Sequence, residues 1–221
     1  MIDPGFIAAA CGTSAQRAIE CAPWLDLGCR RFGIHIGRRL PLFLGQLAHE
    51  SASLEKFREG WGPTAEQLRY EGRADLGNTR PGDGERYRGA GGIQVTGRDG
   101  FAKARDGLRA AFPDLDVPDF EAEPERLAEV KWGCLASAWW WSSHDCNELA
   151  DANDIIGLGR LINRGSAKAT KPAKADGVKA GVEVVLLDGR ADGLAQMAAW
   201  AQGKSGYDAI HVFSHGNVGS V

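Results

Sequence analysis

The sequence predicts a mainly α-helical domain with a long glycine-rich loop region, followed by a short β-α-β fragment. In the first three quarters of the chain, apolar residues recur at three- and four-residue steps, the spacing of one helix face. Residues 60–107 hold 12 of the 30 glycines, and such a stretch inside a domain is typical of a functional loop system. Near the C-terminus, apolar runs at 182–187 and 208–214 flank a helical pattern, which predicts the fragment.

Composition is that of an ordinary globular protein and argues against several other classes. Hydrophobic residues make up 43% of the chain and charged residues 25%. No apolar run approaches the roughly 18 residues of a membrane helix, and the N-terminus lacks the regions of a signal peptide. We therefore expect no membrane insertion and no signal peptide. The net charge of −3 argues against nucleic-acid binding. We expect a monomer.

The five cysteines predict neither a disulfide framework nor a metal site. Their number is odd, and no CxxC or cysteine–histidine metal spacing occurs among them. We therefore expect reduced thiols, as in a cytosolic protein, and no metal or cofactor.

The first helices are placed by their apolar spacing. Residues 14–25 fit a short helix, whereas residues 27–37 fit no single pattern. Residues 41–56 are predicted to form a longer helix, because Pro41 suits a first helical position and apolar residues recur through the segment. Those apolar residues are Leu40, Phe43, Leu44, Leu47 and Leu54.

The glycine-rich region, residues 60–97, is dominated by turn-forming residues and is predicted to be a loop. Residues 93–96 fit a short extended piece at its end. Thr96 to Asp99 fits a capping box, which predicts a helix beginning here. The buried face of that helix is expected to hold Phe101, Ala104, Leu108 and Phe112.

Two further helices, at 125–143 and 154–163, complete the predicted domain. Prolines and acidic residues at 113–124 predict a loop before them. Gly165 lies just past the second helix, as glycines at helix C-termini do. The predicted buried face of the first helix holds Trp132, Leu135, Ala136 and Trp139.

The rest of the chain differs in composition. Residues 166–181 are small and lysine-rich, which suits a linker. The two apolar runs, with a helix at 191–202 between them, predict one right-handed parallel β-α-β unit, which cannot bury both of its faces by itself. We therefore divide the chain into a domain of residues 1–170, a linker of residues 171–181 and a partial unit of residues 182–221.

Glu50 is a candidate general acid. It lies three residues after Leu47 and seven after Phe43, on the apolar side of its helix. Loss of solvation there raises the pKa of a carboxyl, as general acid catalysis at neutral pH requires. Periodicity alone favours the alternative, a glutamate at the rim of a helix that pairs with an arginine.

Glu59 follows nine residues later, where the helix gives way to the glycine-rich region. A carboxylate on a helix and one on the next loop can face each other across a groove, as in an inverting glycosidase. The alternative is a solvated surface carboxylate, since Glu55, Glu66 and Glu71 are similar neighbours.

Gln94 and Thr96 follow a glycine-rich turn, where polar side chains suit sugar hydroxyls or a positioned water. The alternatives are a helix cap for Thr96 and an amide that ties down the loop for Gln94. The three tryptophans at 139–141 fit core packing better than a sugar-stacking platform. Residues 56–109 carry 11 basic and 8 acidic side chains, which weakly favours an anionic or acetylated polymer.

Four motifs together carry a resemblance to a known family. The strings AHES, WGPT, YEGR-x-DLGNT-x-PGDG and GxGxIQxTGR occur in this order. The chain resembles glycoside hydrolase family 19 over about residues 5–170. Within that family it is more similar to the lysozyme-like endolysins of bacteriophages than to plant chitinases.

The resemblance implies a lysozyme-like, two-lobed helical fold around a cleft and inverting cleavage of β-1,4 glycan bonds. The acid of the AHES motif falls on Glu50, and the second carboxylate of the endolysin branch falls on Glu59. Thr96 and Gln94 fall where family members hold the attacking water and the sugar. The predicted catalytic residues are Glu50, Glu59 and Thr96, and the predicted substrate-binding residues are Gln94, Tyr87, Asn163 and Arg164.

The chain departs from the family pattern at three places. The usual GRGxIQ is GAGGIQ here, with Ala90 and Gly92 in place of larger residues, and Gly100 replaces a usual asparagine. These two changes predict a looser loop or weaker sugar contacts. The usual late NGG is Asn163-Arg164-Gly165, a form of the phage branch.

We therefore expect a phage or prophage enzyme that degrades peptidoglycan. It would be made in the cytoplasm and released to the cell wall by a holin-type route. One alternative is a chitinase, and another is a non-catalytic glycan-binding protein, favoured by Ala90 and Gly100. Residues 182–221 resemble the start of domain of unknown function 4347, and we expect no second activity from this partial unit.

Overall fold

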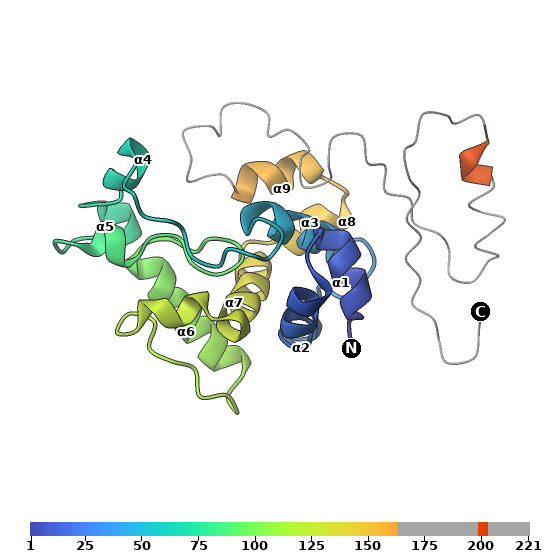
Figure 1. The fold of residues 1–221 in the computed structure, drawn as a ribbon, viewed down its shortest axis with the longest axis horizontal. Coiled ribbons are helices and arrows are strands. Elements are labelled where there is room, and N and C mark those ends of the chain that lie inside the picture. Colours follow the sequence, from blue (N-terminus) through green and yellow to red (C-terminus); the bar gives the residue numbers. More distant parts are fainter. Residues whose placement is uncertain (163–198, 203–221) are drawn as a thin grey trace. The chain divides into compact units, whose positions relative to one another are not determined.

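The computed structural model describes residues 1–162 and 199–202 (Figure 1). The chain falls into two compact units, residues 1–181 and 182–221. In the second unit, residues 199–201 are helical and lie inside the helix predicted at 191–202. The predicted linker and both predicted strands lie outside the described residues, as do Asn163 and Arg164.

The described part of the first unit is helical, with no strand among its residues, which confirms the predicted fold class. The only sheet-like pairings there are two isolated bridges, in which Ala90 pairs with Arg58 and with Val95. The helices are α1 (Pro4–Cys11), α2 (Ala15–Arg31), α3 (Arg39–Glu50), α4 (Ala65–Leu68), α5 (Asp83–Arg86), α6 (Arg98–Ala111), α7 (Val130–Ser143), α8 (Cys146–Asp151) and α9 (Ile155–Ile162), with 3-10 turns η1 (Ala74–Leu76) and η2 (Pro124–Ala128).

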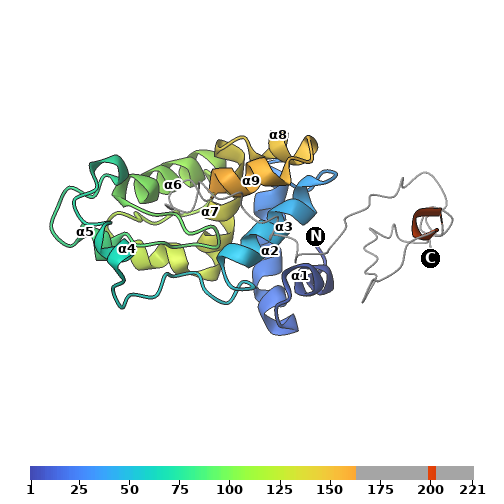
Figure 2. The same cartoon turned by 90° about the horizontal axis from the view of Figure 1, so that it is seen from above.

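Helix α7 lies at the centre of this unit and is buried on two sides. Figures 1 and 2 show α6 on one side of it and α2 on the other. One apolar cluster joins α7 to α1, α2, α3 and α8, and a second joins α7 to α6 and the glycine-rich region. Two clusters that share one helix are consistent with the predicted lysozyme-like, two-lobed domain.

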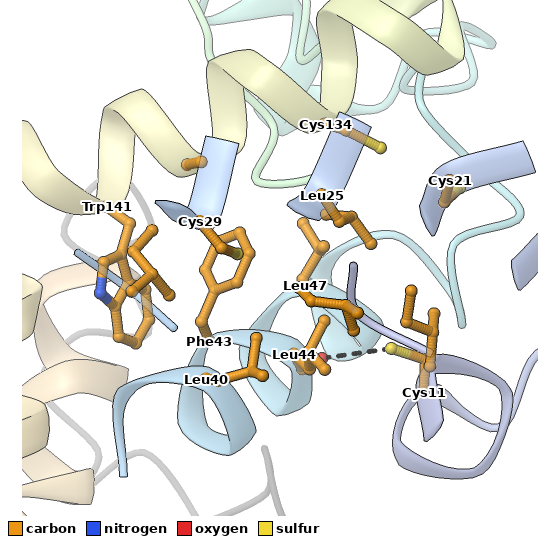
Figure 3. Close-up of a cluster of buried hydrophobic side chains, with 14 of the residues drawn as sticks. Cys11, Cys21, Leu25, Cys29, Leu40, Phe43, Leu44, Leu47, Cys134 and Trp141 are labelled. Atoms are coloured by element: carbon orange, nitrogen blue, oxygen red, sulfur yellow. Dashed lines mark hydrogen bonds between the residues drawn. The ribbon is translucent and has the colours of Figure 1, made fainter. Parts of the chain in front are cut away.

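The first cluster positions the helix that carries Glu50. Phe43 and Leu47 of α3 are fully buried among residues of α2 and α7 (Figure 3). The ring of Phe43 meets Trp141 edge-to-face, with the ring centres 5.4 Å apart. The thiol of Cys11 donates a hydrogen bond to the carbonyl of Leu44 (3.7 Å). These contacts anchor α3 against the rest of the core.

All five cysteines are buried and free. Burial raises the pKa of both Cys11 and Cys146 to about 12, so these thiols stay protonated at neutral pH. Among the described residues, no helix combines the length and apolar character needed to cross a membrane. The same part of the chain contains no cluster of three or more potential metal ligands.

The predicted helix at 41–56 ends six residues early, at Glu50. Ser51 ends it: its hydroxyl donates to the carbonyl of Leu47 (2.6 Å) and accepts from the amide of Leu54 (2.9 Å). These bonds replace the next helical bonds and turn Leu54 inward, where it is fully buried. The apolar spacing therefore predicted burial correctly but not the end of the helix.

Other boundaries were also wrong. The first predicted helix continues to Arg31, through part of the segment that fitted no single pattern. Helix α7 begins at Val130 rather than at 125, because Glu129 is extended (ψ 145°) and separates it from η2. Helices α1, α4, α5 and α8 were not predicted; all have four to eight residues, and α4 and α5 lie within the segment predicted to be a loop.

The capping box at Thr96 was a wrong prediction. Helix α6 begins at Arg98, and its cap position is Gly97, which offers no side chain. Instead, the amide of Arg98 donates to the side-chain oxygen of Asn78 (2.9 Å), a cap supplied from the glycine-rich region. The predicted buried face of α6 is confirmed, since Phe101, Ala104 and Leu108 are fully buried.

Candidate active site

Glu50 is the last residue of α3, and its side chain is partly buried. Burial raises the pKa of its carboxyl above the ordinary value, and the positive charge of His49 opposes that rise. Within the described residues, the carboxyl has no hydrogen-bond or ion-pair partner, so the alternative of a rim glutamate paired with an arginine finds no support there. A carboxyl of this kind can keep a proton that it later donates.

The chain leaves Glu50 through a left-handed turn. Ala52, Ser53 and Leu54 have φ values of 50°, 61° and 67°, a region that residues with a side chain rarely occupy. Each such residue costs about 1 kcal/mol, and strain of this kind collects at functional sites. This turn directly follows Glu50 and begins the segment that ends at Glu59.

Two hydrogen bonds and a neighbouring hydroxyl position the side chain of Glu59. Its Oε1 accepts a hydrogen bond from Nε2 of Gln67 (3.0 Å), and its Oε2 accepts one from the amide of Gly89 (3.0 Å). The hydroxyl of Tyr70 is the third partner, and burial together with the charge of Glu59 raises the pKa of that hydroxyl. The carboxylate is therefore fixed in orientation, unlike a freely solvated surface glutamate.

Sequence reasoning missed these three supporting residues. Gln67 is buried and also forms a reciprocal capping box with Thr64 at the start of α4. That pattern, a threonine followed three residues later by glutamine, was visible in the sequence and marks a fixed side chain. Nothing in the local sequence indicates that Tyr70 or Gly89 meets Glu59, because both meet it through folding of the loop.

The side chain of Gln94 holds the loop in place, as in the alternative interpretation of an amide that ties down the loop. Its Nε2 donates to the carbonyls of Gly91 (3.0 Å) and Lys56 (3.3 Å), and its backbone is left-handed (φ 58°). Its Oε1 accepts no hydrogen bond within the described residues and faces Gly89, where an added Cβ would lie 2.6 Å away. The amide oxygen is thus free to accept a bond from a ligand.

Thr96 lies beside Gln94 and is partly exposed. Its hydroxyl donates to the carbonyl of Gln94 (2.9 Å), so the oxygen lone pairs remain able to accept. The bridge between Ala90 and Val95 closes the turn that carries both side chains. The extended piece predicted at 93–96 is reduced to this single pairing.

The turn with Gln94 packs directly against the helix that carries Glu50. An added Cβ at Gly92 would lie 2.4 Å from Cδ1 of Leu47 and 3.0 Å from the hydroxyl of Ser137. The small size of Gly92 predicted a loose loop, and this prediction is wrong. The side chain of Leu47 occupies the space that a side chain at position 92 would fill. Ala90 is also fully buried and joins both isolated bridges.

Tyr87 was predicted to bind substrate, but the structure buries it. Its side chain is only 1% exposed, packs edge-to-face on Phe101 and donates from its hydroxyl to the carbonyl of Glu121 (2.9 Å). These contacts leave no surface for a ligand, so the proposed substrate site excludes Tyr87.

The prediction that the three tryptophans pack in the core is confirmed only in part. Trp141 is fully buried and donates from its indole nitrogen to Asn147 (3.0 Å). Trp140 stacks on His144 with the ring centres 3.9 Å apart. Trp139 is partly exposed beside a shallow hollow that Gly107 also lines.

The comparisons with known proteins agree with the motifs. The chain is 29% identical over 152 residues to a protein of Haemophilus influenzae named glycosyl hydrolase family 19 domain-containing protein, covering 56% of this chain and 70% of that protein. Residues 171–221 match a family described as Domain of unknown function (DUF4347). The chain is thus similar to a protein with a family 19 glycosyl hydrolase domain, and its last 51 residues are similar to a different family.

Proposed function

We propose that this chain is a glycoside hydrolase of the endolysin type that cleaves β-1,4 bonds of peptidoglycan with inversion. The observation that carries the proposal is Glu50, a partly buried carboxyl with a raised pKa at the end of α3 and with no hydrogen-bond or ion-pair partner among the described residues. The similarity to a family 19 glycosyl hydrolase domain-containing protein supports the reaction class.

In this mechanism, Glu50 donates its proton to the glycosidic oxygen as the bond from that oxygen to the anomeric carbon breaks. Glu59 accepts a proton from a water molecule, whose oxygen bonds to the anomeric carbon from the opposite face. The water supplies one proton to Glu59 and one hydroxyl to the sugar. Proton exchange with solvent then restores both carboxyl groups.

Thr96 and Gln94 hold the water and the sugar. The free lone pairs of the Thr96 hydroxyl and of the Gln94 amide oxygen accept hydrogen bonds from either partner. Because the Gln94 amide nitrogen is held by two carbonyls, its oxygen is fixed in direction before substrate binds. Such preorganisation lowers the cost of positioning the reactants.

The test is loss of turbidity of outer-membrane-permeabilised Gram-negative cells with the wild type and with Glu50→Gln. Removal of the proton donor should slow lysis by a factor of about 10² to 10⁴. Glu55→Gln is the matched control, because Glu55 is an exposed carboxylate five residues away whose side chain accepts a hydrogen bond from Thr13. Equal lysis by wild type and Glu50→Gln would refute the assignment of the acid.

Two further measurements separate the alternatives. Chitin cleaved in parallel, without lysis of walls, would make the protein a chitinase, and wall binding without any cleavage would make it a glycan-binding protein. The anomeric configuration of the first product, observed by NMR, tests inversion directly. An α-configured first product from a β-linked substrate is expected.

A further inference from the structure

Arg58 and Arg86 lie together beside the loop that holds Glu59, and main-chain carbonyls fix both. The guanidinium of Arg58 donates to the carbonyls of Pro124 (3.0 Å) and Arg86 (2.8 Å). The guanidinium of Arg86 donates from Nη2 to the carbonyl of Ala122 (2.7 Å) and from Nε to a tyrosine hydroxyl. Each positive charge is thus held in place by neutral groups.

Arg88 extends this group up to the proposed catalytic base. Its Nε donates to the main-chain carbonyl of Glu59 (2.9 Å), and its Nη1 donates to the main-chain carbonyl of Glu85 (2.9 Å). We call Arg58, Arg86 and Arg88 the arginine cluster. One member of the cluster therefore contacts the same residue whose carboxylate activates water in the proposed mechanism.

The charge of the arginine cluster is not neutralised by close carboxylates. No member forms an ion pair within 4.0 Å among the described residues, whereas Arg98 and Arg105 form several. Burial lowers the pKa of Arg58, the neighbouring charge of Arg88 lowers it further, and Glu125 and Glu59 oppose the shift from a distance. An anion bound beside these guanidinium groups would relieve the repulsion between their like charges.

Two members of the cluster, Arg86 and Arg88, line a shallow hollow at the surface. The hollow is lined by Pro81, Gly82, Glu85, Arg86 and Arg88. Nη1 of Arg86 and Nη2 of Arg88 have no partner in the described part of the chain, so each keeps free N–H donors. Glu85 is the one carboxylate in this lining, against two guanidinium groups.

We propose that Arg86 and Arg88 bind a carboxylate carried by the glycan, and that the neighbouring charge of Arg58 reinforces theirs. This proposal rests on the proposed function and names the substrate feature that its site selects. Guanidinium groups match carboxylates in geometry and bind them by charge-assisted hydrogen bonds. A neutral polymer such as chitin offers no such group, so the cluster selects acidic peptidoglycan.

Two sources can supply the carboxylate in peptidoglycan: the stem peptide, or the lactyl group of muramic acid once the peptide is removed. Three forms of one glycan separate them. The first keeps its stem peptides, the second is stripped by an amidase and exposes lactyl carboxylates, and the third is stripped and then converted to neutral methyl amides. All three keep the same β-1,4 backbone.

Arg86→Gln is the main variant, because Arg88 also supports the main chain of Glu59. The kcat/KM of Arg86→Gln should fall about tenfold on the form whose carboxylate the cluster binds, either the stem-peptide form or the lactyl form, because one charge-assisted hydrogen bond is lost. It should not change on the neutral methyl-amide form. Arg86→Lys should recover part of the loss. The preference of the wild type for the acidic form should shrink as salt increases, because exposed charges are screened.

Arg109→Gln is the matched control, since Arg109 is exposed like Arg86 and its guanidinium donates to a main-chain carbonyl, that of Val117. An equal loss of kcat/KM by Arg86→Gln on the acidic and neutral forms would overturn the proposal and leave the proposed function standing. A wild type that cleaves all three forms equally would do the same. A wild type that cleaves none of the three forms would overturn both. Thermal melting of each variant detects any loss of folding.

Discussion

Glu59 and Gly89 are joined by a pair of hydrogen bonds that uses both the main chain and the side chain of the proposed catalytic base. The amide of Glu59 donates to the carbonyl of Gly89 (2.8 Å), and the amide of Gly89 donates back to Oε2 of Glu59 (3.0 Å). An added Cβ at Gly89 would lie 2.6 Å from Oε1 of Gln94 and 3.3 Å from Oε2 of Glu59. Only glycine lets both side chains approach this amide.

Gly89→Ala should therefore displace Gln94 and Glu59 without removing either. A misplacement of about 1 Å in a catalytic group can reduce rate about 10²-fold, so we expect a loss of this order in kcat/KM on peptidoglycan. Gly62→Ala is the control, because an added Cβ there meets nothing within 4 Å. Full activity of Gly89→Ala would show that the close approach has no role in the site.

The pKa of Glu50 should set the alkaline limit of activity, and His49 should shift that limit. Glu50 must be protonated to act as an acid, so activity falls as pH rises through its raised pKa. The positive charge of His49 lowers that pKa, so His49→Gln should raise it and move the alkaline limb of the kcat/KM profile to higher pH. A shift to lower pH would contradict the electrostatic coupling.

The same burial makes Glu50 unfavourable for stability at neutral pH. A carboxyl whose pKa is raised on folding binds more protons in the folded state, so stability falls as pH rises from its ordinary pKa through its folded pKa. Glu50→Gln, which has no charge to desolvate, should therefore melt at a higher temperature than wild type at pH 7. The difference should vanish near pH 3, where Glu50 is neutral in both states.

The positions of buried side chains could be predicted from the sequence, because helical spacing is local. Phe43 and Leu47 were placed correctly, and so was Leu54, although it lies beyond the end of α3. The end itself could not be predicted, because it depends on a hydroxyl of Ser51 that satisfies backbone groups within a left-handed turn. Apolar spacing does not reveal such side-chain bonds.

The candidate site was only partly visible in the sequence. Family motifs placed Glu50, Glu59, Gln94 and Thr96, but spacing alone could not separate Glu59 from its solvated neighbours. The donors that distinguish it come from 8 and 30 residues away, through Gln67 and Gly89. Long-range contacts within a loop have no period, so no pattern in the sequence predicts them.

Asp83 and Arg98 hold the glycine-rich region onto α6. The side chain of Asp83 is 3% exposed and pairs with Arg98 through two hydrogen bonds. Burial opposes ionisation of Asp83, but the bonds from Arg98 and from the amide of Arg80 outweigh it and hold its pKa below the ordinary value. This pair is therefore stabilising when charged and is lost as pH falls through the depressed pKa.

Asp83→Asn should destabilise the protein by about 3 kcal/mol at pH 7, because it leaves Arg98 without its buried counter-charge. Urea denaturation at pH 7 measures the loss, and the gap from wild type should narrow at pH 3 or below. Asp75→Asn is the control, since the pair of Asp75 with Arg73 is exposed and should matter little. Equal effects of the two substitutions would contradict the role of burial.

The last residues of the chain should be dispensable for cleavage. Residues 171–221 match a different family from the one that the catalytic motifs resemble. In the described part of the chain, the hydrogen bonds that hold Glu59, Gln94 and Thr96 come from residues 56–94. A chain that ends after Lys171 should therefore melt at the same temperature as the full chain and lyse permeabilised cells at the same rate.

Loss of folding in the shortened chain would show that the C-terminal unit packs on the helical domain. Intact folding with lost lysis would instead place part of the glycan site beyond residue 171.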